Sequence, residues 1–184
     1  SGLVPGIYRL AELAPKVRLG WSVGSARSEV RARIMPIEKA HPLDSVFAAL
    51  VHHTNVTHHS SMWAVTLLAG VNDHAEDAQA LLDMAKRYRD ATGRKPRISV
   101  IRYNTIGTDD PFLPVTDEVE QAFRDVFHQQ GFPTHRRYSG GYDLAPLSST
   151  DPGRCGHRTD LLRRAGGRPT PADPGWPAPA GDRP

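Results

Sequence analysis

The sequence predicts an α/β fold in which four parallel strands alternate with helices, about half of an eight-stranded barrel. Three observations support this prediction. Residues 62–68 and 97–103 are apolar runs of strand length, the stretch between them has helical periodicity, and further helical and strand patterns alternate on both sides. A strand, a helix and a strand in this order form a right-handed crossover, and parallel sheets bind ligands where their strands end.

Four elements are expected before this central unit. Apolar residues at helical spacing predict a short helix, and an alternating stretch containing Trp21 predicts a strand. A charged segment predicts one or two helical turns, and the apolar face of Leu43, Val46, Phe47, Leu50 and Val51 predicts a longer helix. In order, these elements are a helix entered at Pro5, a strand within 17–23 ending near Ser22, helical turns within 25–34 and a helix opened by Pro42.

The central unit begins with the buried strand 62–68. After this strand Gly70 allows a tight turn, and Asp73 with Glu76 three residues later forms an acidic variant of the capping box. We therefore expect a helix from about His74.

That helix has an obvious buried face and an obvious end. Its apolar side chains recur at helical spacing, and Gly93 is placed to end it in a left-handed conformation. The strand 97–103 follows, and Asn104 lies just beyond it. The helical face consists of Ala78, Leu81, Leu82, Ala85 and Tyr88.

After Asn104 a polar loop leads to one more helix and one more strand. Thr116 is a suitable N-cap, and Gly131 is expected to stop the helix. Residues 132–138 then suit a fourth strand. The helix buries Val119, Phe123, Val126 and Phe127.

The composition changes abruptly at Ala145. Half of the chain's 16 prolines fall in residues 145–184, mixed with Gly, Arg and Asp. Such a segment cannot bury enough apolar surface to offset its chain entropy. We expect residues 1–144 to form the α/β part and residues 145–184 to be a disordered tail.

Composition limits the functions open to the chain. No stretch is apolar and long enough to cross a membrane, and no secretory leader follows Ser1, so we expect a cytoplasmic protein. The single cysteine, Cys155, can form no internal disulfide and cannot by itself ligate an iron–sulfur cluster. A net charge of +3 is compatible with a polyanionic partner such as RNA, and equally with simple solubility.

Two groups of polar residues are candidates for a site. His52, His53, His58 and His59 could suggest a metal, but adjacent helical histidines point in different directions, so a solvated helix end is the favoured interpretation. Ser22 and Asn104 each end an apolar strand, where a barrel places its ligand contacts, although either could also be an ordinary cap.

Five segments together resemble a known family. They are SGLVPGIYRLAE, WSVGSARSEVRARIMPIEKAHPLDSVFAAL, TLLAGVNDHAEDAQALL, ISVIRYNTIG and QQGFPTHRRYSGGYDL. Their order and spacing resemble the C-terminal half of the radical S-adenosylmethionine adenine methyltransferases of 23S ribosomal RNA and of their antibiotic-resistance relatives. The resemblance covers most of residues 1–144.

The resemblance implies a partial barrel that uses S-adenosylmethionine and a 4Fe–4S cluster to methylate carbon 2 or carbon 8 of an adenine in RNA. It implies that Ser22 begins the family's Ser-Leu-His segment, with Val23 and Gly24 in the places of Leu and His. This segment and Asn104 would contact S-adenosylmethionine. Arg136 and Arg137 are candidates for RNA phosphate contacts, or are simply solvated.

The sequence also departs from the family pattern. The cluster loop Cys-x3-Cys-x2-Cys is absent from this sequence, so no metal ligands are predicted. The family's methylated cysteine would fall at Ser148, whereas Cys155 lies seven residues later. Either the tail presents Cys155 as the catalytic thiol, or the thiol is missing. The expected function is that of a C-terminal fragment of a radical S-adenosylmethionine RNA methyltransferase; the alternative is a non-catalytic α/β remnant or an RNA-binding fragment.

Overall fold

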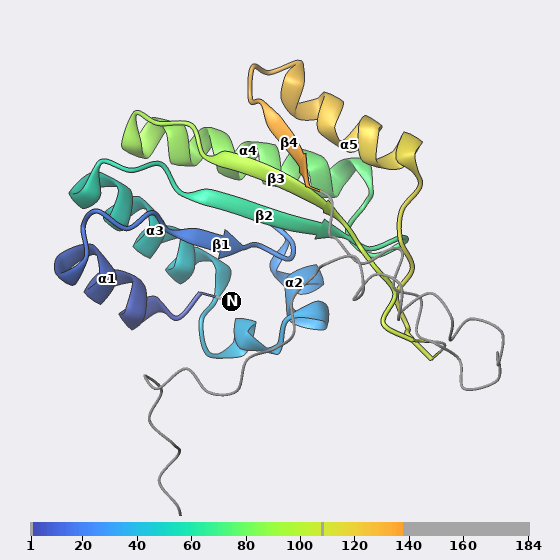
Figure 1. Ribbon diagram of the computed structural model, residues 1–184, viewed down its shortest axis with the longest axis horizontal. Coiled ribbons are helices and arrows are strands. Elements are labelled where there is room, and N and C mark those ends of the chain that lie inside the picture. The colour runs from blue at the N-terminus through green and yellow to red at the C-terminus, as the bar shows by residue number, and fades with distance from the viewer. Residues whose placement is uncertain (1, 108, 138–184) are drawn as a thin grey trace, which may run out of the picture. The chain divides into compact units, whose positions relative to one another are not determined.

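The computed structural model describes residues 2–107 and 109–137. Helices and strands follow one another in the predicted order (Figure 1). The structure also contains a short 3-10 helix, η1, that the sequence pattern did not predict. The tail 145–184 and Cys155 lie outside the described residues. The elements are α1 (Val4–Leu13), β1 (Gly20–Ser22), α2 (Ser28–Ile34), η1 (Pro36–Lys39), α3 (Leu43–Thr57), β2 (Met62–Leu67), α4 (Ala75–Thr92), β3 (Arg97–Arg102), α5 (Asp117–His128) and β4 (Thr134–Arg137).

The four strands form one open parallel sheet in the order β1-β2-β3-β4. Ser22 pairs with Ala64, Thr66 with Ile101, and Ile101 with Arg137. Because the strands are parallel, their carboxyl ends meet at one edge of the sheet (Figure 1). The predicted parallel, partial barrel-like sheet is confirmed, and the described strands do not close into a barrel.

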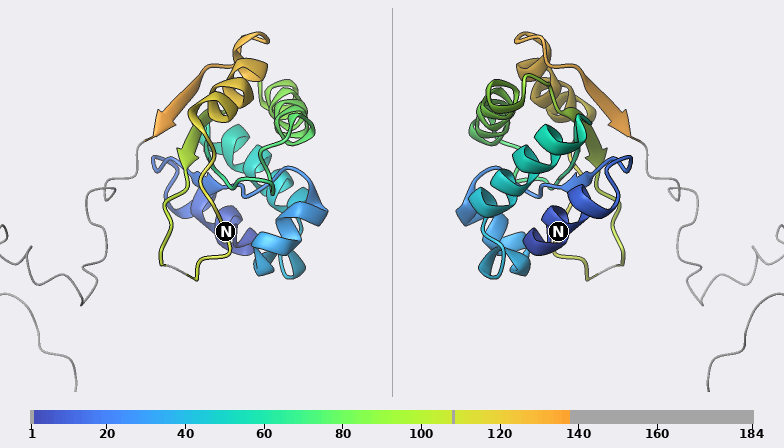
Figure 2. Two further views of the ribbon diagram at one scale, coloured as in Figure 1. Left: turned by 90° about the vertical axis from the view of Figure 1, so that its right-hand side faces the viewer. Right: turned by 90° about the vertical axis from the view of Figure 1, so that its left-hand side faces the viewer.

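The two faces of the sheet differ because successive side chains of a strand point to opposite sides. Figure 2 shows α3 and α4 on one side of the sheet. On that side most strand residues are buried in the core, and we call it the helix face. The other side, which we call the open face, carries partly or fully exposed residues such as Ser22, Ala64 and Thr66. The helix face contributes Trp21, Trp63, Val65, Leu67, Ile98 and Val100 to the core.

The turn before α4 differs from the predicted capping box by one residue. The side chain of Asp73 closes the turn instead, because its Oδ1 accepts a hydrogen bond from the Gly70 amide at 2.9 Å. The helix cap is formed by His74 and Asp77, with the His74 amide donating to Asp77 Oδ2 at 3.2 Å. Gly93 ends α4 with a φ of +69°, as predicted.

Three other boundaries differ from expectation. β1 is confined to Gly20–Ser22, since Val17 is 48% exposed and pairs with no strand. α5 is capped by Thr116 as predicted, but it ends at His128, before Gly131. β4 begins at Thr134, because the apolar Phe132 enters the core ahead of the strand.

The prediction of a solvated histidine cluster is wrong for one member. His53 is fully buried in α3, whereas His52 and His58 are exposed. Thr57 Oγ1 donates to the His53 carbonyl oxygen at 2.7 Å and lies 3.4 Å from its ring nitrogen Nδ1. Burial, followed by the nearby His59 and His52, lowers the pKa of His53 below its ordinary value. In the described residues, no three His, Cys, Asp or Glu side chains form a metal-binding group.

Candidate functional site

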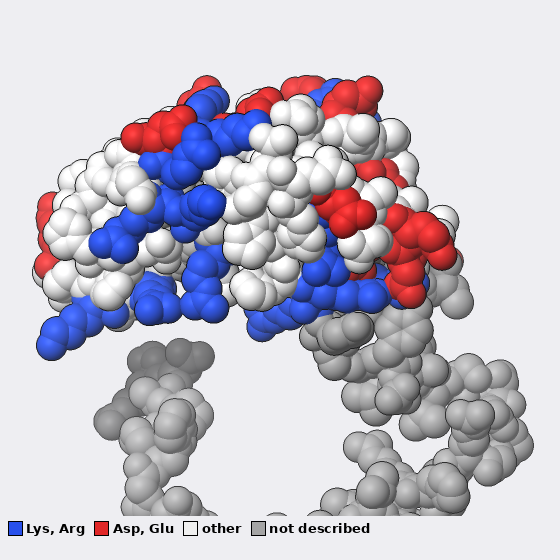
Figure 3. All heavy atoms as spheres, turned by 90° about the horizontal axis from the view of Figure 1, so that it is seen from above, with Lys and Arg blue, Asp and Glu red and all other residues white. Residues whose placement is uncertain are grey.

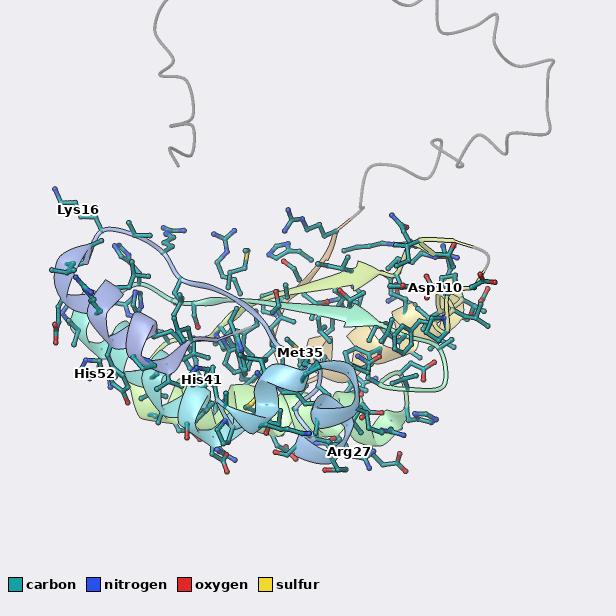
Figure 4. The ribbon with its side chains drawn as sticks, turned by 90° about the horizontal axis from the view of Figure 1, so that it is seen from below. Lys16, Arg27, Met35, His41, His52 and Asp110 are labelled. Atoms are coloured by element: carbon teal, nitrogen blue, oxygen red, sulfur yellow. The ribbon has the colours of Figure 1, made fainter. Side chains whose placement is uncertain are left out.

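A hollow of about 360 Å³ lies at the carboxyl ends of β1, β2 and β3. Its floor comes from the open face of the sheet, and its walls come from the loops that follow these strands. Figure 4 shows Asp110 beyond the carboxyl ends of the strands, Lys16 at the opposite end of the molecule and Met35 between them. The lining residues are Ser22, Gly24, Ile34, Met35, Ala64, Thr66, Leu68, Ile101, Tyr103 and Phe112.

Two of the predicted cofactor-binding residues, Ser22 and Gly24, line this hollow. Val23 between them points the other way and is fully buried in the core. Its amide donates to the Ala64 carbonyl at 2.9 Å, and its carbonyl accepts from Arg31 Nε at 3.1 Å. The side chain of Val23 therefore anchors the segment, while its neighbours face the hollow.

Asn104 is half-buried and lies two residues beyond the end of β3. Its neighbour Tyr103 lines the hollow, and Asn104 is not among the lining residues. The structure thus places Asn104 at the rim, next to the hollow rather than inside it. Its contact with a cofactor stays a prediction.

Gly24 occupies a position at the edge of the hollow that a residue with a side chain could not take without rearrangement. Its φ is +73°, in the left-handed region that favours glycine. A Cβ atom added there would overlap the sulfur of Met35. The absence of a side chain at Gly24 therefore makes room for the Met35 side chain, which packs against the Gly24 backbone at the edge of the hollow.

Asn72 connects the ends of β1 and β2, although the sequence pattern indicates only a turn at this position. Its side chain is 1% exposed. Nδ2 donates to the carbonyl oxygens of Gly24 at 2.7 Å and Thr66 at 2.9 Å, and Oδ1 accepts from the Leu68 amide at 2.8 Å. One amide side chain thus fixes the backbone of three residues that line the hollow.

A buried ion pair supports the same segment from behind. Arg31 of α2 is fully buried and pairs with Glu38 of η1, whose Oε1 accepts a hydrogen bond from the Leu43 amide at 3.0 Å. Burial lowers the pKa of Arg31 from its very high ordinary value. Since Arg31 also donates to the Val23 carbonyl, this pair couples α2, η1 and α3 to the end of β1.

The far wall is a loop held together by Asp110. Its carboxylate accepts hydrogen bonds from the Ile106 amide at 2.8 Å, the Tyr103 hydroxyl at 2.7 Å and the Phe112 amide at 3.0 Å. The Ile106 bond first, then those from Tyr103 and Phe112, lower the pKa of Asp110, and the Asp110 bond raises the pKa of Tyr103. Tyr103 and Phe112 pack edge to face, with their centroids 6.1 Å apart.

The two arginines predicted to contact phosphate are separated by the alternation of β4. Arg136 lies on the helix face, where its guanidinium pairs with Asp117 of α5 at 2.5 Å and with Glu120 at 3.1 Å. Arg137 is exposed on the open face. Arg136 is therefore engaged in ion pairs within the fold, and contact of either arginine with phosphate stays a prediction.

Comparison with known proteins gives a consistent assignment. No family model matches the chain. A probable RNA methyltransferase of Sorangium cellulosum is 39% identical over 99% of this chain and 49% of its own length. A probable dual-specificity RNA methyltransferase RlmN of Akkermansia muciniphila is 32% identical, and the ribosomal RNA large subunit methyltransferase Cfr of Staphylococcus aureus is 31% identical. The latter two are matched over 78% of this chain and 38% and 41% of their own lengths.

Two solved structures resemble this chain in fold. A radical SAM methyltransferase from Sphaerobacter thermophilus superimposes with a TM-score of 0.71 at 27% identity, over 78% of this chain and 40% of that one. A domain of a pyruvate-formate lyase-activating enzyme from Bacteroides vulgatus shares the fold, with a TM-score of 0.50 at 12% identity. The chain spans about half or less of the length of these curated relatives. In sequence and in fold, the chain belongs to the radical S-adenosylmethionine RNA methyltransferases and corresponds to a part of their length.

Proposed function

We propose that this chain forms the S-adenosylmethionine-binding rim of a radical S-adenosylmethionine methyltransferase whose substrate is an adenine in RNA. The observation that carries the proposal is the hollow at the carboxyl ends of the strands. Ser22 and Gly24, predicted from the family motif, both line it, and it lies where parallel α/β sheets bind ligands.

The hollow suits such a cofactor in size and in lining. About 360 Å³ falls within the range of roughly 300–1,000 Å³ common for small-molecule sites. Met35 and Phe112 offer apolar contacts to the methylene groups or the adenine ring of such a cofactor, while Ser22 and Thr66 offer hydroxyl groups. Gly24 makes room for Met35, which lines the hollow beside it.

The roles of the predicted residues follow from their positions. Ser22 and Gly24 contact the cofactor directly, Val23 holds them by packing in the core, and Asn104 reaches it from the rim. Bound S-adenosylmethionine supplies the transferable methyl group in this family. The residues of this chain bind and orient it, and the loop closed by Asp110 limits access of water on one side.

An iron–sulfur cluster does not fit the residues of this sequence. A 4Fe–4S cluster with one open iron needs three thiolates, and the sequence contains one cysteine. That cysteine, Cys155, lies outside the described residues and remains the candidate for the family's methyl-carrying thiol.

RNA is proposed as the substrate and the cytoplasm as the compartment. The described residues contain no helix that is long and apolar enough to cross a membrane. The names of the relatives, which include an RNA methyltransferase and a ribosomal RNA large subunit methyltransferase, support RNA as the substrate class.

Calorimetric titration with S-adenosylmethionine tests the cofactor proposal. The wild-type chain should bind it, and Ser22→Ala or Asn104→Ala should weaken the dissociation constant by roughly 5- to 10-fold, the effect of one lost hydrogen bond. Ser45→Ala, an exposed serine on α3, is the matched control and should bind like the wild type. A wild-type chain that binds no S-adenosylmethionine would overturn the proposal.

A non-catalytic role is the second candidate, because Ser148 stands where the family's methylated cysteine is expected and Cys155 lies seven residues later. A chain that binds cofactor or RNA without turnover needs the hollow but no cluster. Because this chain cannot hold a cluster by itself, the two are separated by incubating it with methyl-labelled S-adenosylmethionine, reductant and RNA together with the cluster-binding part of a related methyltransferase. Incorporation of label into adenine would exclude the non-catalytic role.

A further inference from the structure

The hollow at the carboxyl ends of the strands has an uncharged lining. None of the described residues that line it is Asp, Glu, Lys, Arg or His, although Asp, Glu, Lys and Arg make up 23% of the sequence. Charged side chains are frequent on the outer surface, as the face in Figure 3 shows. The absence of charge is therefore a property of the hollow and not of the chain as a whole.

Charged residues on the segments that border the hollow are engaged within the fold. Arg31 of α2 is buried and pairs with Glu38. Arg102, at the end of β3, pairs with Asp117 at 3.0 Å. The carboxylate of Asp110 accepts three hydrogen bonds from its own loop. Since none of these groups lines the hollow, the described residues offer no opposite charge to a charged ligand group there.

The groups that do line the hollow suit an uncharged nucleoside. Tyr103 and Phe112 form an edge-to-face aromatic pair on one wall, and aromatic side chains stack well on purine rings. The hydrogen bond to Asp110 raises the pKa of Tyr103, which keeps its hydroxyl neutral. On the open face, Ser22 and Thr66 offer hydroxyl groups that both donate and accept hydrogen bonds, as the hydroxyl groups of a ribose do.

S-adenosylmethionine has one end of each kind. Its adenosine part is uncharged, whereas its methionine part carries a sulfonium, an ammonium and a carboxylate group. Moving a charged group from water into a site without an opposite charge costs far more free energy than moving an uncharged group. The uncharged hollow should therefore discriminate between the two ends of the cofactor.

We propose that the hollow of this chain binds the adenosine part of S-adenosylmethionine and leaves the charged methionine part outside it. The inference rests on the proposed function and adds to it the orientation of the cofactor and the part of it that this chain recognises. Groups that neutralise the methionine part come from outside the described residues. This agrees with a chain that spans about half or less of the length of its relatives.

Calorimetric titration of the wild-type chain with three related ligands tests the inference. 5′-Methylthioadenosine keeps the adenosine part but has neither the amino acid nor the sulfonium, and S-adenosylhomocysteine keeps the amino acid without the sulfonium. These two ligands and S-adenosylmethionine should bind with dissociation constants within about 3-fold of one another. Free methionine should not bind.

Two patterns of affinity would overturn the inference and leave the cofactor proposal intact. If S-adenosylmethionine and S-adenosylhomocysteine both bind more than about 10-fold tighter than 5′-methylthioadenosine, the hollow holds the amino acid. If S-adenosylmethionine alone binds that much tighter, the aromatic pair holds the sulfonium as a cation over its rings. Absence of binding by all three ligands would reject the cofactor proposal, and the inference with it.

A substitution in the aromatic pair tests which part of the ligand lies in the hollow. Phe112→Ala should weaken 5′-methylthioadenosine and S-adenosylmethionine by the same factor, about 10-fold, because both lose the contact with the adenine ring. Ile106→Ala is the matched control, since this apolar residue of the same loop is 86% exposed and does not line the hollow. Circular dichroism checks that both variants are folded. An unchanged affinity in Phe112→Ala, or an equal loss in Ile106→Ala, would contradict the inference.

Discussion

Asn72 Nδ2 lies 2.7 Å from the carbonyl oxygen of Gly24, 48 residues earlier in the chain. The bond joins the loops that follow β1 and β2, and the same nitrogen holds the carbonyl of Thr66. Because Asn72 is buried, its three hydrogen bonds cannot be replaced easily by water. The geometry of the hollow's rim therefore depends on a residue that does not line it.

Asn72→Ala should lower the free energy of unfolding by about 3 kcal/mol, because it leaves buried carbonyl and amide groups without partners. The loss is measured by urea denaturation. Asn55→Ala is the control: this exposed residue makes one 3.5 Å bond to the Ala91 carbonyl and should cost less than about 0.5 kcal/mol. In folded Asn72→Ala, affinity for S-adenosylmethionine should also fall, whereas the control should keep it. Similar losses of stability in both variants would argue against the role given to Asn72.

Gly24→Ala should destabilise the fold by two separable effects. The left-handed φ costs a residue with a Cβ about 1–2 kcal/mol, and the added atom meets the Met35 sulfur. Combining Gly24→Ala with Met35→Ala removes the contact with the sulfur and leaves the cost of the left-handed backbone. A double-mutant cycle in urea should therefore give a favourable coupling energy between the two substitutions. Strict additivity would show that Met35 does not limit the space at Gly24.

The buried His53 should make stability fall in acid. Burial lowers its pKa in the folded state, so the unfolded chain takes up a proton at higher pH than the folded chain does. The stabilisation is complete above about pH 6.5, the ordinary value for histidine, and is lost as the pH falls through the lower folded value. His53→Gln should flatten the pH dependence of the unfolding free energy below pH 6.5. The exposed control His135→Gln should retain it, and an unchanged slope in His53→Gln would contradict the assignment.

Neighbouring arginines of β4 should differ in their importance for stability. Arg136→Ala leaves Glu120, only 2% exposed, without its cationic partner and should cost about 3 kcal/mol. Arg137→Ala removes an exposed side chain with no partner among the described residues and should stay within about 0.5 kcal/mol. Thermal unfolding of the two variants gives the comparison. The opposite order would mean that the two faces of β4 have been exchanged.

Local patterns predicted the elements well, because each depends on neighbours in the sequence. The apolar run that forms β2, the stripe of α4 and the glycine that ends it at Gly93 all lie where expected. Thr116 caps α5 for the same reason, through a bond to the Val119 amide three residues later. The capping box was predicted one residue too early. Both Asp73 and Asp77 can accept a hydrogen bond from a backbone amide, and the preceding turn decides which of them caps the helix.

The sequence by itself determined the order of helices and strands and the likeness to an RNA methyltransferase, because periodicity and motif spacing are written along the chain. Only the tertiary structure decided which polar side chains serve a site. It buried His53, paired Arg136 with α5, left Arg137 exposed, and brought Asn72 against Gly24. The physical reason is that burial and ion pairing depend on which side of the sheet a residue faces and on what packs there, and that is set by contacts between residues far apart in sequence.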